Sequence, residues 1–140
     1  MATRGSISIR NEDGTYTGIY CHWDNYLSHT GRILEQHYAD ETKIRQLMAL
    51  GSLSSLRPEI GERQDFNQPT SKDWCLAYGR DRGERDQEAI TTHTVLDLLD
   101  RLGQEYDYLW FDGCWHVRCY ATDTRFVTLE EARRLQAEEG

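Results

Sequence analysis

The chain has 140 residues, of which 38% are hydrophobic and 11% aromatic, and its 24 acidic and 16 basic side chains give a formal charge of -8. This length suits one domain with its own core, and the aromatic content excludes a disordered chain. No run approaches the roughly 20 apolar residues that cross a bilayer, and the N-terminus lacks the apolar centre of a signal peptide. We therefore expect a single domain over 1–140, located in the cytoplasm.

The N-terminal segment predicts a hairpin. Polar and apolar residues alternate over 6–10 and 15–22, and Asn11-Glu12-Asp13-Gly14 supplies turn chemistry between the two runs. On this alternation Tyr20 and His22 share one face of the strand, while Cys21 points to the other.

Three helices follow from capping residues and apolar spacing, over 31–38, 41–50 and 95–102. Their expected N-caps are, in order, Ser28 or Thr30, Asp40 and Thr94. The polar segment 57–72, which holds both prolines, predicts an irregular excursion, mobile in part. It is followed by a short central strand over 74–78 and a charged loop over 79–87.

The strongest hairpin signal lies near the C-terminus. Two β-rich runs, 106–111 and 114–120, flank Asp112-Gly113, whose residues both accept the positive φ of a type I′ turn. A capping box then opens a last helix over 129–137.

Hairpins at both ends, without regular βαβ alternation, predict an α+β fold. We expect an antiparallel or mixed sheet built from the N- and C-terminal hairpins, with helices packed mainly on one face. The residues expected in or near the core are Trp74, Leu109, Phe111, Trp115 and Val117.

One stretch, Ile19-Tyr20-Cys21-His22-Trp23-Asp24-Asn25-Tyr26, concentrates chemically capable side chains between a strand and a helix. Aromatic side chains bury a large area at low entropic cost and suit protein recognition. The predicted partner-binding residues are Tyr20, His22, Asp24, Asn25 and Tyr26. Trp23, by contrast, is expected to fill the core beneath the first helix.

The cysteines Cys21, Cys75, Cys114 and Cys119 are expected as free thiols. Cys114, His116 and Cys21-His22 are candidate zinc ligands, but the Cys-x2-Cys spacing of a zinc knuckle is missing, so we expect no metal and no cofactor. A thiol nucleophile would require Cys21 to meet His116, or Cys114 to meet His22. A small cysteine/histidine-dependent enzyme and a zinc-stabilised interaction module are therefore the alternative functions.

Acids paired for hydrolysis could come from Asp24, Asp107 and Asp112. The turn explains Asp112, and the exposed face of its strand explains Asp107. Asp24 is equally compatible with a site or with side-chain bonds to backbone amides at the start of the helical region.

The acidic balance opposes direct nucleic-acid binding, because phosphate contacts need clustered Lys and Arg. It favours solubility first, and it is compatible with binding a basic protein surface or with partial nucleic-acid mimicry. Arg80, Arg82 and Arg85 are candidates for holding an anionic partner, although neighbouring acids neutralise them.

The first 56 residues resemble a family of small proteins common in bacteriophage and prophage genomes. The resemblance is carried by Asn11-Glu12-Asp13-Gly14, Ile19 to Asp24, His37-Tyr38 with Asp40, Leu50-Gly51 and Ser54-Ser55-Leu56. A weaker likeness covers 77–84 and 106–115. The family usually continues Trp-Asp with Gly-Tyr-Pro, where this chain has Asn25-Tyr26-Leu27.

The resemblance implies a viral gene acting inside a bacterium, and no activity is transferred with it. Small acidic phage proteins without enzyme motifs often disable a host machine by binding it. We therefore expect a non-enzymatic, anti-CRISPR-like inhibitor of a host defence complex. Its expected partner is a host protein or ribonucleoprotein, with no membrane and no direct nucleic-acid contact.

Overall fold

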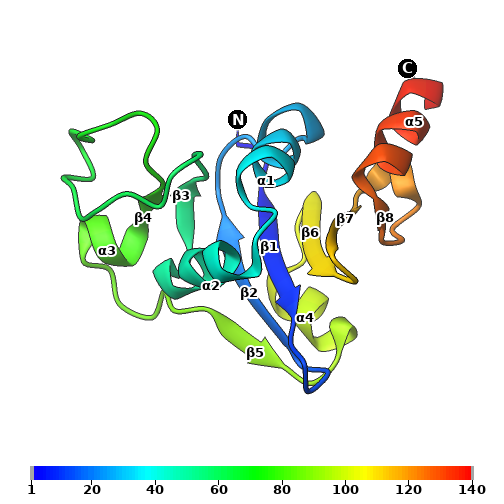
Figure 1. Cartoon of the computed structure of the whole chain (residues 1–140), viewed down its shortest axis with the longest axis horizontal. Coiled ribbons are helices and arrows are strands. Elements are labelled where there is room, and N and C mark those ends of the chain that lie inside the picture. The colour runs from blue at the N-terminus through cyan, green and yellow to red at the C-terminus, as the bar shows by residue number, and fades with distance from the viewer. Residues whose placement is uncertain (1, 140) are drawn as a thin grey trace.

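The computed structural model describes residues 2–139 and has an α+β fold (Figure 1). Eight strands in this part of the chain form one mixed sheet in the order β4-β3-β2-β1-β6-β7-β8, and β5 pairs with β2 outside that order. The strands are β1 (Gly5–Arg10), β2 (Tyr16–Cys21), β3 (Leu53–Ser55), β4 (Leu76–Ala77), β5 (Ile90–Thr92), β6 (Tyr106–Phe111), β7 (Cys114–Arg118) and β8 (Val127–Thr128).

Five α-helices occur in the same residues, together with a π-helix, η1, and a 3-10 turn, η2. They are η1 (Leu27–Gly31), α1 (Arg32–His37), α2 (Glu41–Leu50), α3 (Tyr78–Arg82), α4 (Val95–Leu102), η2 (Tyr120–Thr122) and α5 (Leu129–Glu139). Among the described residues, none of these helices has the length and apolarity needed to cross a membrane.

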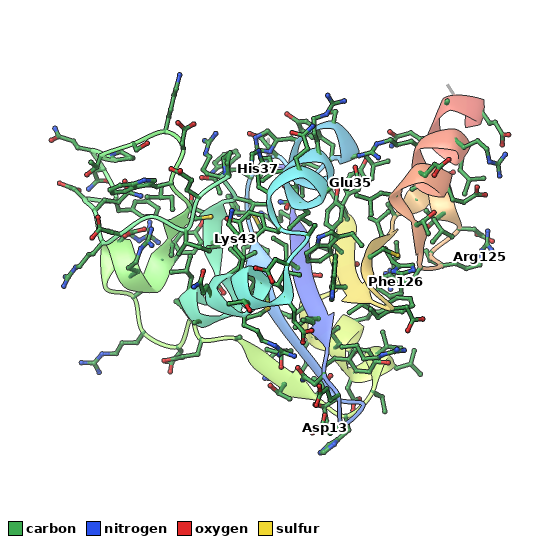
Figure 2. The ribbon with its side chains drawn as sticks, in the orientation of Figure 1. Asp13, Glu35, His37, Lys43, Arg125 and Phe126 are labelled. Atoms are coloured by element: carbon green, nitrogen blue, oxygen red, sulfur yellow. The ribbon has the colours of Figure 1, made fainter. Side chains whose placement is uncertain are left out.

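Both predicted hairpins are confirmed. β1 pairs antiparallel with β2, with Asp13 at the tip of their connection (Figure 2), and β6 pairs antiparallel with β7. Asp112 and Gly113 have φ values of 51° and 76°, so both residues of the β6–β7 turn take the positive φ expected of them. The hairpins join through a parallel pairing of β1 with β6, which makes the sheet mixed.

The main core lies on one face of the sheet. Ile7, Ile19 and Tyr108 are in register across β1, β2 and β6, and all three are buried beneath α1, α2 and α5. Helix α4 covers the opposite face. Its position is marked by Gly18 of β2, where any side chain would meet the methyl groups of Leu98 and Leu102. The helices therefore pack mainly on one face, as predicted, and α4 is the exception.

The middle of the chain departs from prediction. The expected central strand over 74–78 is only two residues long and lies at the end of the strand order. The expected loop over 79–87 begins instead with helix α3, and β3, β5 and β8 were not predicted. Of the expected core residues, Leu109, Trp115 and Val117 are buried, while Trp74 and Phe111 are half-buried.

Three of the predicted helix caps are confirmed, and before α5 the Thr128 hydroxyl accepts from the Glu131 amide at 3.2 Å. The Asp40 carboxylate accepts from the Thr42 amide, and the Thr94 hydroxyl accepts from the Asp97 amide. The expected cap of the first helix is wrong, because the chain enters α1 through η1, and Thr30 uses its hydroxyl as a donor instead.

Candidate functional site

The stretch singled out in the sequence forms a corner where β2 passes into η1. Beyond the last residue of β2, the His22 and Trp23 amides still donate to the carbonyl oxygens of Leu53 and Ser54, so the chain stays extended beside β3. Asp24 then takes a φ of +59°. That left-handed conformation is costly for a residue with a Cβ, and it turns the backbone sharply into η1.

Asn25 holds this corner from the inside. Its side chain is completely buried, and Nδ2 donates to the Thr3 and Cys21 carbonyl oxygens at 2.9 Å each and to Trp23 O at 3.2 Å. Its Oδ1 accepts from the Thr30 hydroxyl at 3.1 Å. An inaccessible side chain cannot contact a partner, so the expectation that Asn25 belongs to the binding surface is corrected. It positions the residues that do reach the surface.

The second anchor is the backbone of Asp24, whose carbonyl oxygen accepts from three groups. These are the Thr30 hydroxyl at 3.1 Å, the Thr30 amide at 3.4 Å and His29 Nδ1 at 3.0 Å. Of the two alternatives left open for Asp24, carboxylate bonds to nearby backbone amides do not form, and the Asp24 carbonyl oxygen accepts the bonds at this point instead. The carboxylate has no hydrogen-bond or ion-pair partner among residues 2–139 and is partly exposed.

The aromatic residues of the corner face solvent. Trp23 is 43% exposed and Tyr26 38%. The ring of Trp23 lies edge-on to His22 at 4.7 Å between centroids, and that of Tyr26 lies against His29 at 6.1 Å. The expectation that Trp23 fills the core is therefore wrong, because the buried position at this corner is taken by Asn25. We call Tyr20, His22, Trp23, Asp24, Tyr26 and His29 the corner surface.

Tyr20 and His22 lie on the same side of the chain, as their alternation predicts. The Tyr20 hydroxyl is 2.7 Å from His22 Nδ1. Partial burial raises the pKa of Tyr20, so its hydroxyl stays protonated at neutral pH. The hydroxyl and the imidazole therefore bond to each other on one side of the chain, and both side chains remain partly exposed.

The cysteine and histidine candidates are not brought together. Cys21 is buried in the main core, where burial raises its pKa to about 12, whereas His116 lies on the opposite face. Cys114 and His116 share a face, as expected, with Sγ and Nε2 3.8 Å apart. Cys114 lies beside the β6–β7 turn, whereas His22 follows the C-terminal end of β2, so these two residues are not brought together either. No group of three His, Cys, Asp or Glu side chains able to hold a metal occurs in residues 2–139.

Asp107 is buried, with 1% of its surface exposed, so its assignment to an exposed strand face is wrong. The carboxylate accepts from the Ser6 hydroxyl at 2.6 Å and the Gln104 amide at 2.9 Å, and it lies 3.4 Å from Arg118 Nε. Burial nevertheless raises the pKa of Asp107. The Asp107 carboxylate on β6 thus links β1 to the segment that follows α4, and its role is structural.

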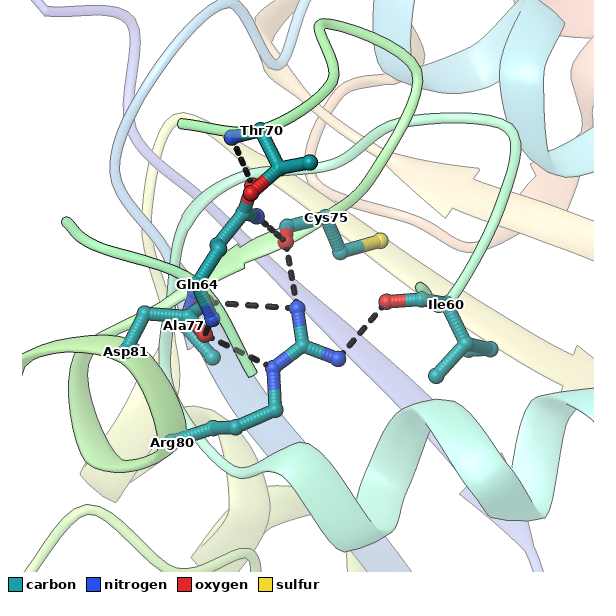
Figure 3. A network of polar contacts seen from close by, with 7 residues as sticks. All are labelled: Ile60, Gln64, Thr70, Cys75, Ala77, Arg80 and Asp81. Carbon is teal, nitrogen blue, oxygen red and sulfur yellow. Dashed lines mark hydrogen bonds and ion pairs between the residues drawn. The ribbon is translucent and has the colours of Figure 1, made fainter. Parts of the chain in front are cut away.

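A second buried acid ties down the irregular segment 57–72 (Figure 3). Asp81 accepts from the amides of Gln64 and Ala77 and pairs with Arg80 at 2.9 Å. The Arg80 guanidinium also donates to the carbonyl oxygens of Ile60 and Cys75 at 2.7 Å each. Arg80 is therefore committed internally and is not free to hold an anionic partner, contrary to the sequence interpretation.

The fold and the corner define a small α+β domain with an aromatic surface held on a fixed turn. Beyond this class, the comparisons add nothing. Neither protein-family models, nor curated proteins, nor solved structures give a match to the chain.

Proposed function

We propose that this protein acts by binding a host macromolecule through the corner surface and thereby inhibits a bacterial defence complex. The observation that carries the proposal is the exposure of two large aromatic rings, Trp23 and Tyr26, on a backbone held from inside by Asn25. A carboxylate without an internal partner, that of Asp24, lies between them in the sequence.

Such a surface suits binding for a physical reason. Exposed aromatic rings release much apolar area from water when a partner covers them, and they have few rotatable bonds to immobilise. The positive φ of Asp24 and the bonds of Asn25 fix the turn before any partner arrives, which lowers the entropic cost of association.

The context comes from the resemblance to phage and prophage proteins. An acidic exterior disfavours contact with nucleic acid itself and favours the basic channels in which defence complexes hold their nucleic acid. Anti-CRISPR action, with partial nucleic-acid mimicry as one route, is the specific form of the proposal.

A plaque assay tests it directly. Expression of the chain in a bacterium whose CRISPR system targets an infecting phage should restore plating, and a Trp23→Ala/Tyr26→Ala double variant should not. A Leu96→Ala/Tyr120→Ala variant removes two other exposed side chains and should behave as wild type. Failure of the wild-type chain to protect phage from CRISPR and restriction systems, with no host protein retained on it at moderate salt, would overturn the proposal.

A further inference from the structure

A second surface, far along the sheet from the corner, is formed by two adjoining hollows. The first, of about 650 Å³, lies where the β1–β2 and β6–β7 turns meet the start of α2. The second, of about 390 Å³, lies between α1, β7 and the start of α5. Both are lined by Trp110 and Gly113, so we treat them as one groove, the turn groove. In Figure 1, β6 and β7 lie between α1 and α5.

The lining of the turn groove is aromatic and acidic. Its carboxylates come from both turns and from three helices, while Arg10 is the one basic side chain that lines it within the described residues. The acids are Glu12, Glu35, Glu41, Asp112 and Glu130, and the aromatic residues are Tyr16, Trp110, Phe111 and Trp115.

The groove already holds one guanidinium. Arg10 pairs with the Asp112 carboxylate at 2.9 Å, and its guanidinium carbon lies 5.1 Å from the centre of the Phe111 ring. A planar cation placed over an aromatic face and bonded to a carboxylate is the arrangement that favours arginine over lysine. The protein's own side chain thus shows which ligand chemistry this lining accepts.

Part of the acidic lining is left without a counter-charge. Glu41 pairs with Arg45, and Glu35, labelled in Figure 2, pairs with Arg133 of α5. Glu12 and Glu130 have no ion-pair partner among residues 2–139 and are exposed. The half-buried ring of Trp110 lines both hollows and packs edge-on against Trp115, with 5.4 Å between the ring centroids. Two carboxylates of the groove, those of Glu12 and Glu130, and the exposed part of the Trp110 ring are therefore available to a ligand.

We propose that the turn groove binds an arginine-bearing, extended segment of the partner protein. This inference rests on the proposed function only in that the protein acts by contacting another macromolecule, since it concerns a different surface from the corner. Complementary charge steers the segment to the groove, and cation–π contact with Trp110 selects guanidinium over ammonium. The volume of each hollow lies within the range of small-ligand sites, which leaves room for an arginine side chain and part of the backbone that carries it.

Fluorescence anisotropy with a labelled Gly-Arg-Gly-Arg-Gly-Arg peptide, at an ionic strength of about 0.15 M, tests the groove. The peptide should bind more tightly than its Gly-Lys counterpart. A Glu12→Gln/Glu130→Gln variant should weaken binding about fivefold, as expected for the loss of two exposed charge pairs. An Asp100→Asn/Glu105→Gln variant, which changes the net charge equally at exposed positions outside the groove, should bind as wild type.

Three results would overturn the inference: no binding of the arginine peptide, equal binding of the lysine peptide, or equal weakening by both double variants. A fourth such result would come from analytical sedimentation. If the wild-type chain self-associates and the Glu12→Gln/Glu130→Gln variant does not, the groove binds a second copy of the chain. The Trp23→Ala/Tyr26→Ala variant should retain peptide binding. If the wild-type chain binds the peptide but does not protect phage, the proposed function fails and the groove stands. If the wild-type chain protects phage but does not bind the peptide, the groove fails and the proposed function stands.

Discussion

The Tyr108 hydroxyl donates a 2.7 Å hydrogen bond to the backbone carbonyl oxygen of Asn25, 83 residues away in the chain. Both residues are buried, and the bond ties the C-terminal hairpin to the corner that begins η1. The corner surface therefore depends on a contact that spans most of the chain, although all of its members lie within ten residues of sequence.

This bond predicts the effect of Tyr108→Phe. The ring still fills its place, but the Asn25 carbonyl oxygen loses its donor in a buried setting, so the free energy of unfolding should fall by about 1–3 kcal/mol. Urea-induced unfolding measures the change. Tyr120→Phe, at a residue that is 89% exposed, is the matched control and should leave stability unchanged. Equal stability of the two variants would contradict a structural role for the Tyr108 bond.

Replacement of Asn25 by Ala should lower the free energy of unfolding more than a substitution at the surface does. It should also disorder the corner. Three donor contacts of Nδ2 and one acceptor contact of Oδ1 disappear, among them the buried bond to the Cys21 carbonyl oxygen, so we expect the free energy of unfolding to fall by at least about 2 kcal/mol. Hydrogen exchange should become faster at the Thr30 amide. Asn67→Ala, on an exposed loop, is the control. Unchanged exchange at Thr30 would show that Asn25 does not hold the turn.

These long-range bonds also explain what the sequence could and could not predict. The hairpin at Asp112-Gly113 and the helices capped by Asp40 and Thr94 are specified by neighbours in the sequence, and they form where local chemistry places them. The two-residue strand β4 and the three-residue strands β3 and β5 have no period long enough to detect. Their pairing is decided by strands elsewhere in the chain.

The corner lies at the strand-to-helix junction that the sequence indicates, but the burial of two of its residues, Trp23 and Asn25, is opposite to that expected. Alternation correctly separates Cys21 from Tyr20 and His22, because a strand has a fixed period. The alternation ends with β2 at Cys21, and polarity misleads in the residues that follow, since Trp23 is exposed while Asn25 is buried. The positive φ of Asp24 turns the chain at the next residue, Asn25, which is buried, and Asp and Asn are the non-glycine residues that tolerate this conformation best.

The thiols should differ sharply in reactivity. Cys21 and Cys75 are buried, and burial raises the pKa of both, to about 12 for Cys21, whereas Cys114 is exposed. Iodoacetamide applied to the folded protein at pH 8 should therefore modify Cys114 first, as only thiolates react. Mass spectrometry of peptides gives the order, and protein in guanidinium provides the reference in which all four react. Rapid labelling of Cys21 in the folded protein would instead favour the cysteine-enzyme alternative.

The Arg80–Asp81 pair should control the segment 57–72. Arg80→Ala leaves the buried Asp81 carboxylate without its cation, and removal of one partner from a buried pair costs about 3–5 kcal/mol. Because Arg80 also bonds Ile60 and Cys75, proteolysis should shift to 57–72 before global unfolding. Arg85→Ala, at an exposed position, should leave both stability and cleavage unchanged. Protection of 57–72 in Arg80→Ala would show that the segment is held by other contacts.

Asp107 should give a measurable pH dependence of stability. Burial raises the pKa of its carboxyl in the folded protein, so the folded state binds more protons than the unfolded state between the ordinary aspartate pKa, about 3.9, and the raised value. This contribution to the free energy of unfolding therefore falls as pH rises through that window and is constant above it. Subtracting the stability of Asp107→Asn from that of the wild type should isolate this decline. Ser6→Ala removes a bond that lowers the pKa of Asp107, so it should widen the window. A difference that grows with pH would mean that the hydrogen bonds and Arg118 outweigh burial.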